Sequence, residues 1–122
     1  MGPMRTVVFV CAHGAYRSRV AAAFFNAAAP PGWRATSAGV EPQETMSEAA
    51  VRVVRGTPAE PHLDQVAPRT IAAAGQGDRV VSIDCEVPGA DRWSLEVPEV
   101  GPAQRDEIRA RAERLAAELS GG

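Results

Sequence analysis

The run TVVFV, residues Thr6 to Val10, constrains the fold more than any other stretch of this 122-residue chain. Its β-branched and aromatic residues do not alternate with polar ones, so both faces of the predicted strand must be buried. A strand of this kind lies in the middle of a parallel sheet that is covered on both sides. Further strands are predicted at Trp33–Ala38, Arg79–Ile83 and Arg92–Val97.

Helical segments alternate with these strands. Helices are predicted from Arg17 to about Ala28, within MSEAAVRVVR after the N-cap Ser47, within Val66–Ala74, and from Pro102 onward, whereas Thr57–Gln65 is predicted to be a loop. The alternation predicts an α/β fold: one domain over residues 1–122 with a four-stranded parallel sheet flanked by helices. Met1 to Pro3 are interpreted as an added segment, because Met4 is a plausible natural start.

The composition argues against several classes of function. The formal net charge is −2, which gives no general attraction to nucleic acid or to an anionic membrane surface. No segment has the roughly 20 apolar residues of a membrane span, and the N-terminus lacks a signal peptide's apolar region, so we expect a cytoplasmic protein. Two cysteines are too few for a disulfide framework, and with only His13 and His62 beside them we expect no metal site and no bound cofactor.

The segment between the first strand and the first helix has the features of an anion site with a nucleophile. Cys11 ends the strand, and Arg17 and Ser18 open the helix. Backbone N–H groups and the helix dipole at such a junction favour anions and the thiolate form of a cysteine. Arg17 offers a planar fork for a tetrahedral oxyanion, and Ser18 can donate to the thiolate. We therefore predict Cys11 as the nucleophile beneath a bound oxyanion. The predicted binding residues are Ala12, His13, Gly14, Ala15, Tyr16 and Arg17.

This Cys-x5-Arg-Ser pattern, after a buried strand and before a helix, resembles the low-molecular-weight protein tyrosine phosphatase superfamily, which includes thioredoxin-coupled arsenate reductases. Ser37-Ala38-Gly39 resembles the family's Ser-Ala-Gly element, and DRVVSID resembles the phosphatase strand that ends in Met-Asp. RWSLEVP is similar to the His-Trp-x-x-Asp-Asp-Pro segment of the reductases. The resemblance spans most of the chain, and the short length fits the reductase branch. It implies a four-stranded parallel sheet with Cys11 as the nucleophile.

The loop itself departs from the family pattern Cys-x-Gly-Asn-x-Cys-Arg-Ser. His13 replaces the glycine, Gly14 the asparagine and Tyr16 the second cysteine. The family's asparagine braces the loop through its side chain, so another group must do so here. His13 is one candidate; it could instead supply positive charge near the thiolate or simply face solvent.

A second departure concerns proton transfer. The phosphatases use an aspartate just before a proline as the general acid, but Val97 stands before Pro98 here. Glu96 and Glu99 are the candidate substitutes. Loss of a placed general acid costs about 10²–10⁴-fold in rate, which argues against efficient phosphoester hydrolysis. The resemblance also predicts no potassium site, because Ala22 stands where some reductases have a glutamate.

Cys85 is the predicted resolving thiol. In the reductases that the chain resembles, a second cysteine attacks the arsenylated nucleophile, arsenite leaves, and thioredoxin reduces the resulting disulfide. The family uses two further cysteines and this chain has one, which lies one position beyond the relay slot that Asp84 occupies. The alternative is that Cys85 only packs and that an external low-molecular-weight thiol resolves Cys11. Asp84 is expected either to contact His13 or the substrate, or to cap the following turn.

The resemblance thus implies an arsenate reductase that acts through Cys11 and Cys85. The alternatives are a tyrosine or small-phosphoester phosphatase with an unusual acid, and an oxyanion-binding or redox-sensing domain without turnover. The expected partners are arsenate or phosphate and a thioredoxin-type or low-molecular-weight thiol reductant, with no nucleic acid and no membrane.

Overall fold

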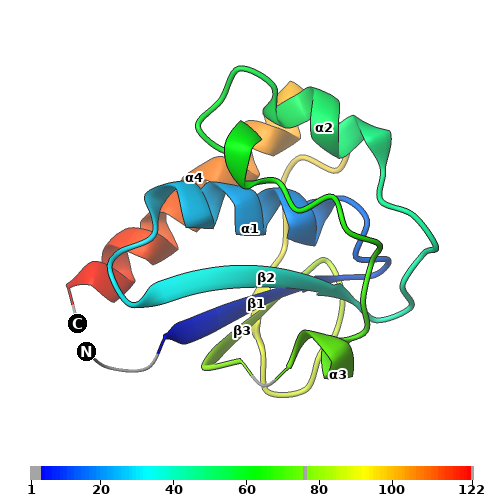
Figure 1. Cartoon of the computed structure of the whole chain (residues 1–122). Coiled ribbons are helices and arrows are strands. Elements are labelled where there is room, and N and C mark those ends of the chain that lie inside the picture. The colour runs from blue at the N-terminus through cyan, green and yellow to red at the C-terminus, as the bar shows by residue number, and fades with distance from the viewer. Residues whose placement is uncertain (1–3, 76, 122) are drawn as a thin grey trace.

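The computed structural model describes residues 4–75 and 77–121, so the interpretation of residues 1–3 lies outside the described residues. It has the predicted four-stranded parallel sheet, in the order β2-β1-β3-β4 (Figure 1). The strands are β1 (Arg5–Cys11), β2 (Trp33–Gly39), β3 (Arg79–Ile83) and β4 (Asp91–Trp93). The helices are α1 (Arg17–Ala28), α2 (Glu48–Val54), α3 (Ile71–Ala74) and α4 (Pro102–Ser120), with a 3₁₀ turn, η1, at Glu60–His62.

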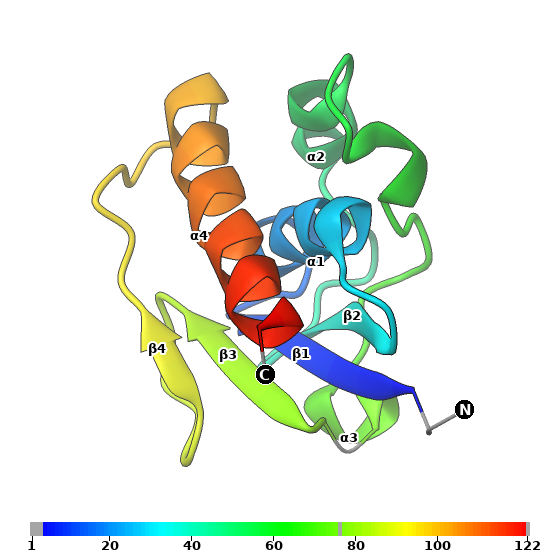
Figure 2. The ribbon, with the colours of Figure 1, turned by 90° about the vertical axis from the view of Figure 1, so that its left-hand side faces the viewer.

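Strand β1 is buried on both faces, as its sequence predicts. Helices α1, α2 and α4 lie on one side of the sheet and α3 on the other (Figures 1 and 2). Val7 and Phe9 belong to the large core on the α1 and α4 side, where Phe9 contacts Phe25 edge-on. Val8 and Val10 belong to a smaller apolar cluster on the α3 side. The central strand therefore joins two cores and fixes the position of Cys11 at its end.

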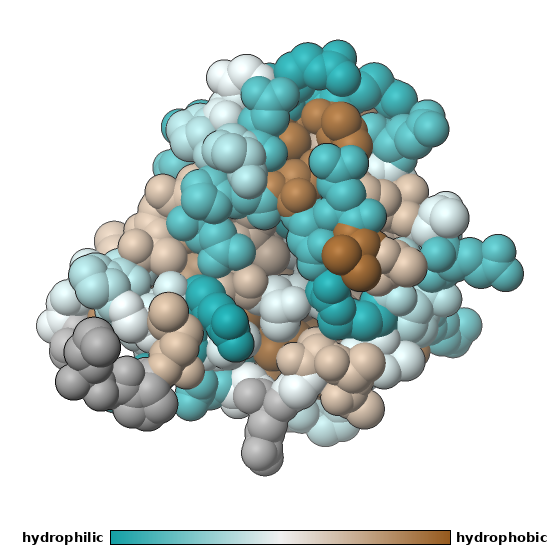
Figure 3. All heavy atoms as spheres, in the orientation of Figure 1, coloured by the Kyte–Doolittle hydropathy of each residue, from teal (hydrophilic) through white to brown (hydrophobic). Residues whose placement is uncertain are grey.

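The surface carries few large apolar side chains. On the face shown in Figure 3, hydrophobic residues form small separate patches among polar ones. Within the described residues, the exposed large hydrophobic side chains are Met4, Val40, Val66 and Val100. Across residues 4–75 and 77–121, none of the helices combines the length and hydrophobicity that a membrane span needs.

The order of the strands determines where a ligand can bind. The chain leaves β1 to form β2 on one side and later returns to form β3 on the other. Parallel sheets bind ligands beyond the carboxyl ends of the strands at such a switch point. Cys11, Gly39 and Asp84 lie at or directly after the carboxyl ends of β1, β2 and β3.

Two predicted elements are shorter than expected, and one predicted loop contains a turn of helix. The strand predicted to run to Val97 ends at Trp93, because the next amides are bound by side chains: Asp84 accepts from Leu95, and Glu107 accepts from Val97. The helix predicted within Val66–Ala74 begins only at Ile71, after Thr70, whose hydroxyl caps it by accepting from Ala73. Between Thr57 and Gln65 the chain forms the 3₁₀ turn η1.

Candidate active site

The loop after β1 turns its carbonyl groups outward. Five consecutive carbonyls accept hydrogen bonds from the outer side of the loop: those of Cys11, Ala12, His13 and Ala15 from the amides of Val40, Glu41, Gln43 and Ser47, and that of Gly14 from the side chain of Arg19. In a trans peptide the N–H points opposite to the C=O. The amides of residues 12–16 are therefore directed to the inner side, beside the N-terminus of α1. This arrangement makes a cradle of N–H donors, which is what an oxyanion needs.

The thiol of Cys11 lies at the base of this loop. The residue is 4% exposed, and its Sγ donates to Oγ of Ser18 at 3.1 Å. The amide of Ser18, in the first turn of α1, donates to the same sulfur at 3.4 Å. If the thiol loses its proton, the Ser18 hydroxyl can turn its hydrogen from the carbonyl of Ala38 to the sulfur. The structure thus brings the predicted nucleophile and its predicted hydroxyl partner together.

Arg17 lies at the mouth of the loop between two groups. Its Nη2 donates to the carbonyl oxygen of Pro98 at 3.3 Å, and its Nε is 3.6 Å from Oδ2 of Asp84. That Nε is buried without a hydrogen-bond partner among the described residues, so it can donate to a bound anion. Asp84 has a left-handed backbone (φ 53°), and its Oδ1 accepts from the amide of Leu95 at 3.0 Å. Asp84 therefore holds the segment after β4, rather than the turn that directly follows it, and also faces Arg17.

Arg19 is a residue of the site that the sequence did not single out. Its side chain is fully buried. Its Nε and Nη2 donate to the Gly14 carbonyl at 3.3 and 3.2 Å, and its Nη1 donates to the carbonyls of Asp64 and Val66, both at 2.6 Å. The sequence does contain a pattern that could have indicated it: a second arginine directly follows the Arg-Ser pair and precedes the apolar run Val20–Phe25. In the structure Arg19 and this run are buried. Arg19 thus links Gly14 of the loop to the segment that carries Asp64 and Val66.

His13 lies on the outer surface of the loop. Its side chain is exposed, and its Nδ1 lies 3.3 Å from the carbonyl oxygen of Glu41. Tyr16 packs into the large core, and burial raises the pKa of its hydroxyl, against the opposing effects of the Gly101 amide and Arg105.

The loop packs directly on the end of β2. A Cβ atom added at Gly39 would lie 2.6 Å from the nitrogen of Gly14 and 2.6 Å from the carbonyl carbon of His13. Gly14 itself has a φ of 65°, a conformation that glycine adopts without strain. These two glycines allow the backbones of the loop and of β2 to touch, which ties the cradle to the sheet.

Cys85 faces the α3 side of the sheet, where it lies beside Val10. Its Sγ donates to the carbonyl oxygen of Val10 at 3.5 Å, and it packs with the small cluster on the α3 side. Burial raises the pKa of the Cys85 thiol, against a smaller opposing effect of the Ile83 amide. Both cysteines are free thiols, and the Cys11 sulfur lies on the other side, against α1. A disulfide between them requires the turn after β3 to move.

The two candidate acids lie in the segment on either side of Pro98. Glu96 and Glu99 are exposed, and the amide of Glu96 donates to the carboxylate of Glu107. Glu96 lies in the predicted strand Arg92–Val97 but outside the observed one, because β4 ends at Trp93. Gln104 donates to the carbonyls of Val97 and Pro98, so this segment is held with a carbonyl, not a carboxyl, toward Arg17. Neither glutamate contacts the loop among the described residues.

No group of three or more His, Cys, Asp or Glu side chains in the described part of the chain is arranged to hold a metal ion.

This arrangement, a cysteine beneath an anion loop at the end of a central parallel strand, is that of a cysteine-dependent phosphatase-like enzyme. The chain belongs to the low molecular weight phosphotyrosine protein phosphatase family, whose profile matches residues 6–86. A comparison with curated protein sequences gives no match.

Solved structures of two activities share the fold. An arsenate reductase from Archaeoglobus fulgidus is 33% identical, with a TM-score of 0.68 over 95% of this chain and 99% of that one. The thioredoxin-dependent arsenate reductase of Corynebacterium glutamicum is 24% identical, with a TM-score of 0.76 over 97% of this chain and 63% of that one. A low molecular weight protein tyrosine phosphatase from T. tengcongensis is 20% identical, with a TM-score of 0.72 over 94% and 99% of the two chains. The last two likenesses, both under 25% identity, establish the fold.

Proposed function

We propose that this enzyme is an arsenate reductase in which Cys11 is the nucleophile. The observation that carries the proposal is the segment around Pro98. The carbonyl of Pro98 accepts from Arg17, and Val97 stands where the phosphatases that the chain resembles have their general acid. Arsenate loses an oxygen as water or hydroxide and depends less on such an acid than a phosphate ester does. The 33% identity with an arsenate reductase over nearly the whole of both chains supports the same assignment.

The chemistry proceeds in two steps. The Cys11 thiolate attacks the arsenic atom while Arg17 and the amides of the loop bind the oxygens, and water leaves once an arsenate oxygen has taken up protons. A second thiolate then attacks the Cys11 sulfur and the As–S bond breaks. Its electron pair reduces As(V) to As(III), which leaves as arsenite, and the two sulfurs form a disulfide. Ser18 stabilises the Cys11 thiolate before the first step.

Cys85 is the proposed resolving thiol. It is the chain's second cysteine, and it already contacts the peptide that leads into Cys11, through the carbonyl of Val10. To react it must leave that carbonyl and come around the end of β1. An external thiol is the alternative, and thioredoxin or a low-molecular-weight thiol would then supply the reducing equivalents directly.

One observation favours the second candidate, a phosphatase. The Asp84 carboxylate lies at the mouth, 3.6 Å from Arg17, so one carboxyl group is near the anion site although none directly precedes Pro98. Phosphoester hydrolysis would need Cys11 and Asp84 but not Cys85.

The test is arsenite production from arsenate with thioredoxin, thioredoxin reductase and NADPH, for wild type, Cys11→Ser and Cys85→Ser, beside p-nitrophenyl phosphate hydrolysis. The proposal expects activity in the wild type and none in either variant. Activity of Cys85→Ser with a small thiol would assign the second step to an external thiol. Hydrolysis that survives Cys85→Ser, with no arsenite formed by the wild type, would replace the reductase by the phosphatase.

A further inference from the structure

Arg19 is a buried charge next to the predicted nucleophile. It follows Ser18 on α1, none of its side chain is exposed, and all three of its guanidinium nitrogens donate to main-chain carbonyls. Burial lowers the pKa of the Arg19 guanidinium, an effect that the Asp64 carboxylate and the Cys11 sulfur oppose. A buried charge of this kind is costly unless hydrogen bonds and opposite charges offset its loss of hydration.

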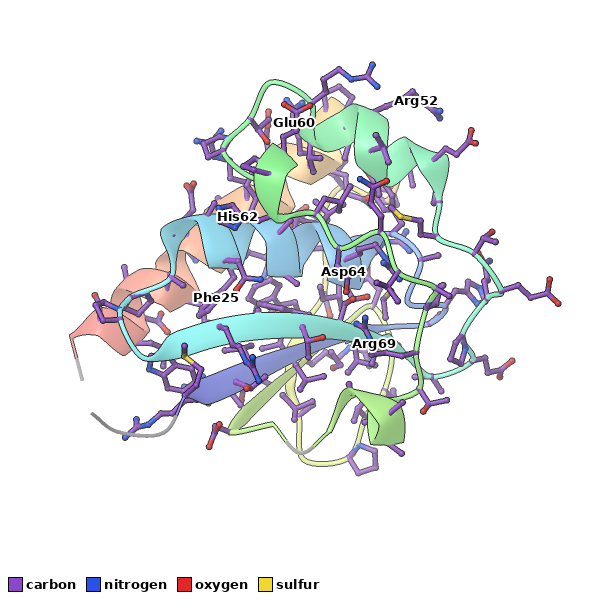
Figure 4. The ribbon with its side chains drawn as sticks, in the orientation of Figure 1. Phe25, Arg52, Glu60, His62, Asp64 and Arg69 are labelled. Carbon is purple, nitrogen blue, oxygen red and sulfur yellow. The ribbon has the colours of Figure 1, made fainter. Side chains whose placement is uncertain are left out.

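The charge of Arg19 is not fully balanced. The nearest carboxylate, that of Asp64, is 3.9 Å from Arg19 but 2.7 Å from Arg69, from which it accepts a hydrogen bond. In Figure 4 the labelled side chains of Asp64 and Arg69 lie next to each other. Two arginines thus share one carboxylate, which leaves one positive charge over in this cluster. The part of the cluster that faces the loop is Arg19.

The contact between Arg19 and Gly14 has a directional consequence. Four of the five outward carbonyls of the loop are held by backbone amides of residues 40–47, and the Gly14 carbonyl is the one held by a side chain. Because the peptide is trans, this contact also turns the amide of Ala15 to the inner side. Gly14 has φ 65° and the freedom of a glycine, so its peptide can rotate if the arginine is removed.

We propose that Arg19 is a positioning residue of the anion loop with two effects: it holds the Ala15 amide toward the bound oxyanion, and its uncompensated charge favours the Cys11 thiolate and the anion. The inference rests on the proposed function only in taking the loop as the oxyanion site. Arg19 thus holds the loop where Gly14 has no side chain to do so, and its charge adds an electrostatic contribution that a neutral side chain would lack.

The test compares four variants in a Cys85→Ser background, which leaves Cys11 as the chain's one thiol. Arg19→Met removes both effects, Arg19→Lys keeps the charge but loses the paired donation to Gly14, and Asp64→Asn increases the net positive charge. Arg34→Met is the matched control, because it removes an exposed arginine of β2. The readouts are the dissociation constant of inorganic phosphate and the pH profile of Cys11 alkylation by iodoacetamide, with circular dichroism to verify folding.

The two effects give different expected results. Arg19→Met should weaken phosphate binding about 10- to 100-fold, as loss of a supporting residue behind a binding group does, and should move the alkylation profile to higher pH. Arg19→Lys should weaken phosphate binding but leave the profile nearly in place. Asp64→Asn should move the profile to lower pH, opposite to Arg19→Met. The other charged groups at the mouth, Arg17 and Asp84, pair with each other, and like His13 they are unchanged in all variants.

The opposite shifts distinguish this role from simple packing. A loss of stability alone would not move the two profiles in opposite directions. Unchanged phosphate affinity in a folded Arg19→Met, or an Asp64→Asn profile that stays in place or moves to higher pH, would overturn the inference. If Arg19→Met does not fold, Arg19→Lys and Asp64→Asn decide the question. A wild type that neither binds phosphate nor reduces arsenate would instead refute the proposed function.

Discussion

Replacing Gly39 by alanine is expected to disable the anion loop by steric displacement. The added Cβ would lie 2.6 Å from two backbone atoms of the loop, whereas ordinary contacts begin at 3.4 Å. The loop must therefore move by roughly 0.8 Å, the difference between these two distances. The neighbours are the nitrogen of Gly14 and the carbonyl carbon of His13, which cannot rotate away as a side chain could.

The expected magnitudes follow from this displacement. Overpacking by one methyl group costs about 1–3 kcal/mol of stability. A misplacement of about 1 Å in a catalytic constellation costs on the order of 10²-fold in rate. We therefore expect Gly39→Ala to remain folded, with a lower melting temperature, and to lose about 10²-fold in kcat/KM for its oxyanion substrate.

The assay pairs thermal unfolding with turnover and phosphate binding. Gly121→Ala is the control, because a Cβ there would meet its nearest atom at 3.8 Å, an ordinary contact. The control should match the wild type in all three measurements. Wild-type phosphate affinity and turnover in Gly39→Ala would show that the loop does not depend on its contact with β2, and would refute the reasoning.

Three further predictions concern the mouth of the site. The Glu107 carboxylate accepts two backbone amides and a guanidinium, and although burial raises its pKa, these bonds lower it overall. Because the folded-state pKa is depressed, this stabilisation is present above the unfolded-state pKa of about 4.3 and is lost as the pH falls through the folded-state pKa. Glu107→Gln should therefore lower the free energy of unfolding by about 1–3 kcal/mol at pH 7, and in urea titrations this difference from the wild type should disappear below pH ~4. A difference that does not depend on pH would contradict this. Val97→Asp, which restores an acid before Pro98, should raise p-nitrophenyl phosphate hydrolysis by at least about tenfold; an unchanged rate would mean that position 97 faces away from the leaving group. Asp84→Asn should tighten phosphate binding several-fold at low salt, because the carboxylate no longer competes with phosphate for Arg17. Weaker binding would instead show that Asp84 orients Arg17 toward the anion.

The sequence was most informative where one local pattern determines the structure. The uninterrupted apolar run of Thr6–Val10 predicted a central strand, and the structure places it there, from Arg5 to Cys11. The helix predicted from Arg17 to about Ala28 has those bounds, since the prolines that follow end it. The cysteine, the arginine and the serine of the loop lie together because the strand and the helix that carry them are adjacent in sequence.

Contacts between distant segments could not be predicted in this way. The end of β4 depends on Asp84 and Glu107, which bind amides 11 and 10 residues away. The interpretation of Cys85 depended on the direction of its side chain after a left-handed residue, and the structure turns it toward the α3 side. Arg19 escaped notice because a helical arginine is usually exposed, and its partners Asp64 and Val66 belong to a loop more than 40 residues away.

The chemistry of the substrate gives a physical reason for a charged brace in this loop. An asparagine can hold a loop through neutral hydrogen bonds at little desolvation cost. Arg19 must offset the loss of its hydration with its main-chain carbonyls and a shared carboxylate. A buried charge adds electrostatic stabilisation that grows with the negative charge on the ligand and is weakly screened by salt. At a site for a multiply charged oxyanion and a thiolate, that added stabilisation can outweigh the cost of burial. The contribution of Arg19 to phosphate affinity should therefore depend far less on ionic strength than the contribution of the solvent-accessible Arg17.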